Sequence, residues 1–252
     1  MASAATQVAF DGGWNIPTPH LVSNNRGFRP VLADTPLATL SSEPLQELES
    51  FMSVTDYSPG DVLFLEQESL NRVFVVLAGE VKLSLQDISG RRLTFRIAKR
   101  GTILGMHSVL FGSLSECSAE ILYRSSIASI ARVDFVRFAG RHPEAYRIAS
   151  IELIRTLRNA CETLRTVGLS SCVRKRLASQ LLAWGERGIK TGDQTQFRMA
   201  LTHAQIAEFI GAVRETVTRA LTEFKQRGLV IIRGSMLTIP STTALRKYAE
   251  RG

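Results

Sequence analysis

Residues 201–229 constrain the fold of this chain more than any other segment, because they fit two short helices separated by a single glycine. Thr202 and Gln205 have the spacing of a capping box, which predicts that a helix begins at this point. Gly211 interrupts the apolar face of that helix, and a second helical pattern runs from about 214 to 227. Two short helices joined by a tight glycine turn form a helix-turn-helix.

The second helix of the pair has one apolar and one polar face. The apolar positions recur at helical spacing and are Val217, Ala220, Leu221 and Phe224. The polar side chains point away from that stripe and are Arg214, Glu215, Thr218 and Arg219. An arginine can bind O6 and N7 of guanine together, and a glutamate can accept a hydrogen bond from N4 of cytosine. The polar face is therefore expected to read DNA bases, and the alternative is an ordinary Glu–Arg pair on a solvated helix.

A hairpin is predicted directly after these helices. The apolar segments 229–232 and 236–239 flank a turn at 233–235. Together with a preceding strand at 197–201, the hairpin completes a winged helix. Arg233 in the turn is then expected near the DNA phosphates.

The positive charge of the chain is concentrated around this unit. Residues 1–168 contain 17 Lys and Arg against 17 Asp and Glu, whereas residues 169–252 contain 14 against 6, so the second part carries the whole formal net charge of +8. A neutral part followed by a basic part predicts that the second part binds a polyanion. A basic surface that serves only solubility is the alternative.

Short apolar runs separated by glycines fill the region from 37 to 143 and predict a β-roll of the jelly-roll type. The runs lie at 62–65, 73–77, 81–85, 93–97, 103–104, 121–123 and 127–130. In one of them, Lys82 and Ser84 alternate with apolar residues, which is the pattern of a strand with one solvated face. A short helix is expected at the start of this region, at 37–51, and the composition of residues 1–36 predicts a flexible arm.

A long helix is expected at 144–168, between the roll and the basic domain at 169–252. An apolar stripe with 3-4-3 spacing runs along it and consists of Ile154, Leu157, Cys161 and Leu164. This stripe fits a seam between two copies of the chain, and packing on the chain's own domain is the alternative. The expected fold class is α+β, with an N-terminal β-roll, a long dimerisation helix and a C-terminal winged helix-turn-helix domain.

The residue content argues against several classes of protein. A cupin-type metalloenzyme needs clustered histidines, but the four histidines are dispersed at 20, 107, 142 and 203. The three cysteines, Cys117, Cys161 and Cys172, include no CxxC pair, which predicts reduced thiols in the cytoplasm. No apolar run is long enough to span a bilayer, and the first residues lack the pattern of a secretion signal. The chain is expected to be neither an enzyme nor a membrane protein and to hold no metal or resident cofactor, with a dimeric scaffold that does not bind DNA as an alternative.

The segment Gly211-Ala-Val-Arg-Glu-Thr-Val-Thr-Arg219 resembles the recognition motif G-x-S/T-R-E-T-V-x-R of the Crp/Fnr family of bacterial regulators. The resemblance extends over about 37–240, through Pro59–Phe64, Val75–Lys82 and Gly101–Gly105. It implies a cyclic-nucleotide-binding-like roll, a dimerising helix and a winged helix. A member of this family is expected to be a cytoplasmic transcription regulator that binds palindromic double-stranded DNA as a homodimer and has RNA polymerase as a further partner.

By this resemblance, Arg214, Glu215 and Arg219 are the base-reading residues. Phosphate contacts are expected from a second group of side chains, namely Thr202, Thr216, Thr218 and Arg233. The resemblance supplies Thr202 and Thr216. Val213 departs from the family motif, which has Ser or Thr at this position, and the change removes a side chain that caps the helix and contacts a phosphate.

The effector pocket of the family is degenerate in this sequence. The cyclic-nucleotide members have Gly-Glu-Leu where this chain has Gly105, Met106 and His107, and they have Arg-Ser-Ala where this chain begins with Cys117 and Ser118. The carboxylate that holds the ribose and the arginine that pairs with the cyclic phosphate are therefore both replaced. We expect an effector other than cAMP, either an unknown small molecule or none.

Other sensing chemistries stay open as alternatives. They are the binding of a cyclic nucleotide, a redox signal at the Cys117 thiol, and a gas signal through haem bound by His107. Iron–sulfur sensing of the family's type is excluded, because residues 1–116 contain no cysteine. Gln67 occupies a position at which the family has glycine.

Overall fold

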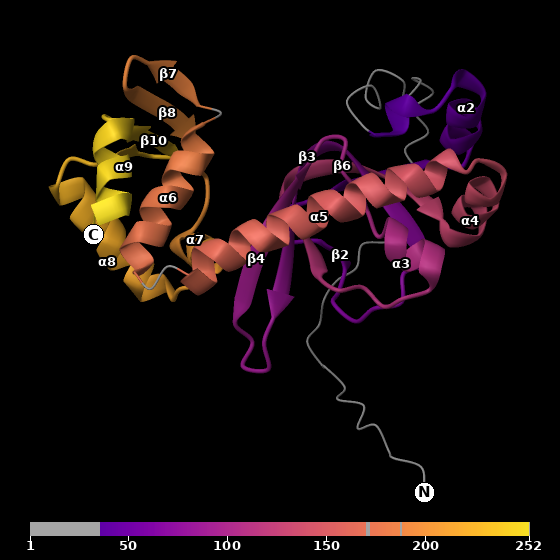
Figure 1. The fold of residues 1–252 in the computed structure, drawn as a ribbon, viewed down its shortest axis with the longest axis horizontal. Coiled ribbons are helices and arrows are strands. Elements are labelled where there is room, and N and C mark those ends of the chain that lie inside the picture. Colours follow the sequence, from indigo (N-terminus) through magenta and orange to yellow (C-terminus); the bar gives the residue numbers. More distant parts are fainter. Residues whose placement is uncertain (1–35, 170–171, 187, 252) are drawn as a thin grey trace, which may run out of the picture.

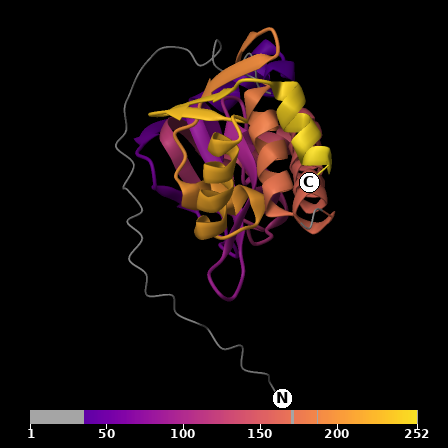
Figure 2. The same cartoon turned by 90° about the vertical axis from the view of Figure 1, so that its left-hand side faces the viewer.

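The computed structural model describes residues 36–169, 172–186 and 188–251, so the arm predicted for 1–36 lies outside the described residues except for Pro36. The predicted α+β fold class is confirmed. Figure 1 shows a β-roll at one end and a smaller domain at the other, with helix α5 (Glu144–Leu169) running along the roll to reach the smaller domain. Figure 2 shows the same arrangement end-on, with the C-terminal domain in front of the roll.

The roll is built on one antiparallel sheet in the order β1-β6-β3-β4, with β2 paired to β6 and β5 paired to β3. Its strands are β1 (Ser53–Tyr57), β2 (Val62–Phe64), β3 (Arg72–Gln86), β4 (Arg92–Lys99), β5 (Ile103–Leu104) and β6 (Ser118–Ala131). Its helices are the 3-10 turn η1 (Pro36–Thr39), α2 (Ser42–Ser50), α3 (Met106–Phe111) and α4 (Arg132–Arg141). The single helix predicted at 37–51 is thus two elements, because Ser41 between them has an extended backbone.

One predicted strand boundary is wrong. The segments 73–77 and 81–85 belong to one strand, β3. The segments 121–123 and 127–130, which are predicted together, both lie in β6. Gly79 lies within β3 with φ +87°, where the register against β6 shifts. A glycine at such a bulge bends a strand without ending it.

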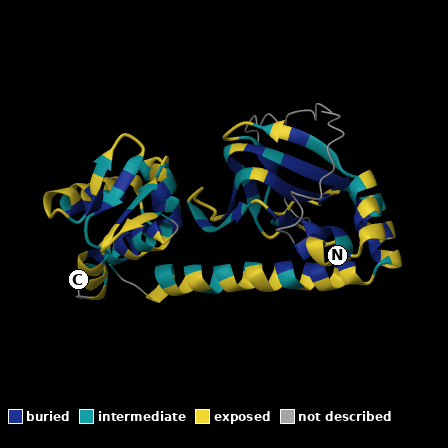
Figure 3. Cartoon of the chain, turned by 90° about the horizontal axis from the view of Figure 1, so that it is seen from above, coloured by how far each residue is buried: buried dark blue, intermediate teal, exposed yellow. Residues whose placement is uncertain are grey.

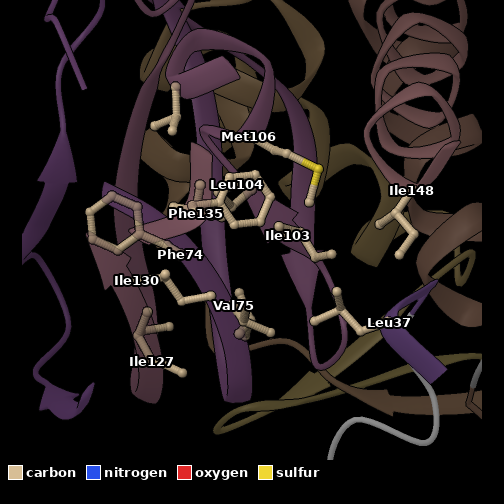
Figure 4. Packing of buried hydrophobic residues seen from close by; sticks show 14 of the residues in the cluster. Leu37, Phe74, Val75, Ile103, Leu104, Met106, Ile127, Ile130, Phe135 and Ile148 are labelled. Atoms are coloured by element: carbon tan, nitrogen blue, oxygen red, sulfur yellow. The ribbon is translucent and has the colours of Figure 1, made fainter. Parts of the chain in front are cut away.

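The core of the roll lies between the sheet and the helices that follow it. Figure 4 shows side chains from β3, β5 and β6 packed with Phe135 of α4 and Ile148 of α5. These side chains are almost completely buried. Burial of apolar surface of this kind is the main favourable term in folding, and here it fixes the first turns of α5 on the roll.

The prediction that Lys82 and Ser84 face solvent is wrong. The side chain of Lys82 is 2% exposed, and Ser84 is buried to the same degree. The ammonium group of Lys82 instead contacts the carboxylate of Glu208 on α7 (His203–Ile210), the first helix of the helix-turn-helix. The strand is therefore covered on its second face by a part of the chain that lies far away in the sequence.

Helix α5 is buried only at its beginning. Its buried residues are Ala145, Ile148, Ala149 and Glu152, all in its first third. Beyond them Figure 3 shows a largely exposed helix. Along this part the predicted seam residues Ile154, Leu157 and Leu164 are 57%, 61% and 65% exposed. This face of the helix therefore does not pack on the described part of its own chain.

The C-terminal domain combines a four-stranded antiparallel sheet, in the order β7-β8-β10-β9, with four helices. Its strands are β7 (Ile189–Thr191), β8 (Gln194–Arg198), β9 (Ile231–Arg233) and β10 (Met236–Ile239). Its helices are α6 (Val173–Gly185), α7 (His203–Ile210), α8 (Arg214–Gln226) and α9 (Thr242–Arg251). No helix in the described ranges is long and apolar enough to cross a membrane.

Candidate nucleic-acid interface

The first helix of the predicted helix-turn-helix begins with the predicted capping box. Thr202 Oγ1 accepts a hydrogen bond from the Gln205 backbone N–H at 3.2 Å, and the Thr202 N–H donates to Gln205 Oε1 at 2.9 Å. These bonds satisfy two amide groups that the first turn of a helix leaves without partners. The hydroxyl expected to contact a phosphate is thus already engaged in the cap.

Gly211 makes the tight turn between the two helices. Its φ of +58° lies in the left-handed region, which favours glycine. A Cβ at this position would lie 2.7 Å from Cγ1 of Val167, near the end of α5. The turn therefore requires glycine for its backbone angle and also for its close approach to the long helix.

The two faces of α8 separate as the sequence predicts. Val217, Ala220, Leu221 and Phe224 are buried in the core of the domain. Arg214, Glu215 and Arg219 are exposed on the other side and make no ion pair with any described residue. The alternative of a Glu215–Arg219 pair is thus not what the structure shows. Val213 is the N-cap residue of α8, and its side chain makes no cap hydrogen bond.

A histidine that the sequence analysis did not single out joins the two helices at the exposed face. His203 Nδ1 lies 2.8 Å from Thr218 Oγ1, and the Thr218 hydroxyl donates to the Arg214 carbonyl oxygen at 3.0 Å. Since the hydroxyl hydrogen is used on that carbonyl, His203 is the donor to the Thr218 oxygen. This chain of bonds fixes the first turn of α8, which carries Arg214, against the start of α7.

The hairpin of β9 and β10 provides the wing. Arg233 pairs with Met236 across the hairpin, and it is exposed next to Gly234, whose φ is +56°. The strand predicted at 197–201 is β8 and ends at Arg198, because Met199 bonds to the hairpin turn through its backbone and Thr202 starts α7. Thr216, the remaining predicted phosphate contact, is half-buried in the first turn of α8.

Charged groups hold this domain against the roll. Lys82 Nζ lies 2.8 Å from Glu208 Oε2 and 3.4 Å from Glu120 Oε2. Thr94 of β4 donates a hydrogen bond to the same Glu208 oxygen at 3.3 Å. These contacts place the first helix of the helix-turn-helix on the edge of the roll.

Arg176 of α6 connects the long helix to the turn of the helix-turn-helix. Its guanidinium donates from Nη1 to the Val167 carbonyl and from Nη2 to the Gly211 carbonyl, both at 3.3 Å. The side chain is buried, at 9% exposure. One cation therefore serves the C-terminal ends of both α5 and α7, where carbonyl groups lack helical partners.

The five predicted effector residues do lie together, but around very little space. A cavity of about 40 Å³ is lined by Gly105, Met106, His107 and Cys117, with Ser118 next in the chain. Pockets for small organic ligands usually enclose about 300–1,000 Å³. The buried ion pair between Arg96 Nη2 and Glu152 Oε2, at 3.0 Å, lines the same cavity. The space that these side chains leave is therefore far smaller than such pockets.

The polar groups around this small cavity bond to other groups of the protein. His107 pairs with Glu116, and Ser118 Oγ accepts a hydrogen bond from the Glu66 backbone N–H at 3.0 Å. Burial, with the nearby Glu116 and Glu66 carboxylates, raises the pKa of the Cys117 thiol to about 12. A thiol with such a pKa reacts poorly with oxidants, which argues against redox sensing at Cys117. The described residues include no group of three His, Cys, Asp or Glu side chains able to hold a metal ion.

Two protein-family models match the chain. A cyclic nucleotide-binding domain matches residues 54–142, and a Crp-like helix-turn-helix domain matches residues 175–248. A CRP-like cAMP-activated global transcriptional regulator of Mycobacterium tuberculosis is 27% identical over 196 residues, which cover 77% of this chain and 87% of that protein. The nitrogen fixation regulation protein FixK of Bradyrhizobium diazoefficiens is 26% identical and covers 77% of this chain and 81% of its own length.

Solved structures show the same fold. FixK2 from Bradyrhizobium japonicum superposes with a TM-score of 0.65 at 21% identity, covering 78% of this chain and 96% of that one. The c-di-GMP responsive global regulator CLP of Xanthomonas campestris superposes with a TM-score of 0.70 at 17% identity, covering 80% of this chain and 100% of that one. Both domains and their order agree with the resemblance that the motif at 211–219 indicates. The chain belongs to the Crp/Fnr family of transcription regulators.

Proposed function

We infer that this regulator binds a palindromic DNA site as a homodimer, with α8 of each copy in a major groove. The observation that carries the proposal is the exposed face of α8, where Arg214, Glu215 and Arg219 are free of partners among the described residues. A buried opposite face holds the helix rigidly, so these three side chains are presented together. Arginine and glutamate in this setting match guanine and cytosine edges in the major groove.

The phosphate contacts of this proposal come from the periphery of the helix-turn-helix. Arg233 on the wing is exposed and close to the turn of the hairpin, which suits a backbone contact. Thr202 and Thr216 lie in the first turns of α7 and α8, where backbone N–H groups also point outward. Thr218 uses its hydroxyl hydrogen on the Arg214 carbonyl, so its oxygen is its remaining means of contact and its role is chiefly to hold the helix.

The second copy is expected to cover the exposed stripe of α5. Ile154, Leu157 and Leu164 are each more than half exposed, and Cys161 between them is half-buried. Apolar residues at a and d spacing become buried when two such helices pair. One recognition helix per chain then requires two half-sites about one helical turn, roughly 34 Å, apart. RNA polymerase as a partner and a cytoplasmic location follow from this function.

The effector of this regulator is expected not to be a cyclic nucleotide bound in the roll. The cavity at Met106 and Cys117 encloses about 40 Å³, and no acid or arginine stands where the family's nucleotide contacts are. The M. tuberculosis relative is named as cAMP-activated, but the two residue changes remove the charged contacts that such a ligand uses. Each lost charged hydrogen bond costs about 1.5–3 kcal/mol of binding free energy.

Selection of bound sequences from a random DNA pool, followed by gel-shift titration, tests the proposal. The selected site should be an inverted repeat, and the complex should contain two chains. Arg214→Ala should weaken binding by about 1–3 kcal/mol and relax the preference at one G·C pair. Arg246→Ala, an exposed arginine of the same domain on α9, is the matched control and should leave the base preference unchanged. A selected pool without an inverted repeat, or equal effects of the two substitutions, would refute the proposal.

A further inference from the structure

A cavity much larger than the one at the family's nucleotide position lies between the roll and the DNA-binding domain. It encloses about 920 Å³, against about 40 Å³ at the family's nucleotide position. The roll contributes residues of β4 and β6 to its wall, and the other domain contributes residues of α6 and β8. Helix α5 closes a third side. A volume of this size is in the range of small-molecule sites, which often lie between domains.

Aromatic side chains from both domains line this cavity. Phe95 and Tyr123 line it from the roll, and Trp184 and Phe197 line it from the C-terminal domain. All four side chains are half-buried, so each keeps a surface that faces the cavity. Trp184 packs edge-on against Phe209 at 5.2 Å between ring centroids, which fixes its orientation. Its indole N–H has no hydrogen-bond acceptor among the described residues.

The rim of the cavity is polar and has both signs of charge. Arg124 and Arg198 supply donors, and Glu162 and Glu186 supply acceptors. None of these four exposed side chains makes an ion pair with the described part of the chain. Aromatic walls with free donors and acceptors at the opening suit a molecule with an aromatic body and a polar end that both donates and accepts hydrogen bonds.

The position of the cavity allows a ligand to touch both the roll and the DNA-binding domain without covering the proposed dimer stripe of α5. Residues 159, 162, 163 and 166 of α5 line it. In a helix of 3.6 residues per turn, these positions lie on the side opposite Ile154, Leu157, Cys161 and Leu164. A ligand in the cavity therefore leaves the proposed dimer stripe free, while it touches the roll and the DNA-binding domain at once.

We propose that this interdomain cavity is the effector site, that it takes an aromatic amphipathic small molecule, and that its occupancy alters DNA affinity. The inference rests on the proposed function, since it assigns the regulation of the same DNA-binding face. A ligand that bridges two domains changes their relative position only if it binds one arrangement better than another. Linkage then requires DNA to change ligand affinity by the same factor as the ligand changes DNA affinity.

The test uses 8-anilinonaphthalene-1-sulfonate, which has an aromatic body, an N–H donor and an anionic acceptor, as the probe. The full chain contains two tryptophans, Trp14 and Trp184, so Trp14→Phe leaves Trp184 as the only energy donor. Titration should show one saturable site per chain, with quenching of Trp184 emission and sensitised probe emission. Saturating probe should also change the gel-shift affinity for the selected DNA at least threefold, and the DNA should change probe affinity by the same factor.

Two exposed alanines provide matched variants. Ala183→Phe on α6 places a ring in the cavity and should weaken probe binding at least tenfold, whereas Ala244→Phe on α9, outside the cavity, should leave it unchanged. Ser179→Phe, one turn before Ala183 and also in the lining, should repeat the loss, and thermal unfolding followed by circular dichroism checks that each variant folds.

The outcomes separate the inference from the proposed function. The inference is overturned if the probe shows no saturable site, if all folded variants bind it equally, or if the bound probe leaves DNA affinity unchanged. Failure of the protein to bind any DNA, both without and with probe, would instead overturn the proposed function.

Discussion

Lys82 Nζ on the roll lies 2.8 Å from Glu208 Oε2 on the first helix of the helix-turn-helix, although 126 residues separate them in the sequence. The lysine is 2% exposed, and its carboxylate partners Glu208 and Glu120 are 22% and 18% exposed. Removal of one partner from a buried ion pair is costly, because the remaining charge stays away from water. This pair is therefore expected to stabilise the packing of the two domains against each other.

Glu208→Gln should lower the free energy of unfolding by about 1–3 kcal/mol, measured by urea denaturation. Lys82→Met should restore part of that loss when it is combined with Glu208→Gln, so the double variant should be more stable than the sum of the single effects predicts. The more exposed pair Lys99–Glu80, at 2.7 Å, is the control, and the equivalent substitutions there should cost only about 0–1 kcal/mol. Equal coupling energies at the two pairs would contradict the role given to Lys82.

Arg233→Ala should change how DNA affinity depends on salt rather than which sequence is bound. Each neutralised phosphate contributes about −0.9 to the slope of log affinity against log salt concentration. Loss of one contact in each copy of a dimer should therefore flatten the slope by about 2. Gel-shift titrations at several salt concentrations measure the slope. A changed base preference with an unchanged slope would mean that the wing reads bases.

The thiols of Cys172 and Cys117 should differ strongly in their rate of alkylation. Hydrogen bonding from the Lys175 backbone N–H at the start of α6 lowers the pKa of Cys172, whereas burial raises the pKa of Cys117 to about 12. At pH 8 nearly all of Cys117 is therefore in the unreactive thiol form, because the thiolate is the reactive form.

Iodoacetamide labelling followed by mass spectrometry, in a Cys161→Ser background, should modify Cys172 at least about 100-fold faster than Cys117. In urea, the unfolded chain should lose this difference. Similar rates in the folded protein would show that Cys117 is accessible as a thiolate, and would support a redox-sensing role for this residue.

Asp193 should hold the start of α9 in a pH-dependent way. Hydrogen bonds from the side chains of Ser241 and Thr242, followed by the Thr243 backbone N–H, lower the pKa of its carboxyl group. A lowered pKa in the folded state stabilises the fold above the ordinary pKa of aspartate, near 4, and this contribution is lost as the pH falls toward the folded-state pKa.

Hydrogen exchange of the α9 amides measures this effect. Asp193→Asn should speed their exchange at pH 6, and the difference from the unsubstituted protein should shrink below pH 4. Asp56→Asn, at an exposed aspartate of β1, is the control and should leave α9 exchange unchanged. A difference that does not depend on pH would assign the role of Asp193 to shape rather than charge.

The helix-turn-helix could be predicted almost completely, because its signals are local. The capping box at Thr202, the glycine at 211 and the apolar stripe of α8 all act within a few residues, and the structure has each of them. Helices α4 and α6 were not predicted, since their apolar residues face cores assembled from distant strands and helices. For the same reason the alternating pattern at 81–85 predicts a solvated face for Lys82, which is in fact 2% exposed.

In the roll, Gly79 and Gln67 each differ from what their residue type predicts. Gly79 suggests a break between strands but lies in a bulge within β3. Gln67 replaces a family glycine and still adopts φ +64°, the only positive φ among the described non-glycine residues. The backbone of this turn is held by tertiary bonds, such as the 2.7 Å bond from the Gln67 N–H to the Ser115 carbonyl, which no local pattern shows. The interdomain cavity and the His203–Thr218 bond are likewise products of packing.

The two bonds of Arg176 have a mechanical consequence for the reading helix. The guanidinium holds the Val167 carbonyl at the end of α5 and the Gly211 carbonyl in the turn before α8, both at 3.3 Å. A sliding movement between the two segments would break one of these bonds inside a buried environment, whereas a swing about the guanidinium would keep both. We therefore expect Arg176 to act as a pivot, about which the DNA-binding domain changes its tilt on the long helix without changing its distance from it.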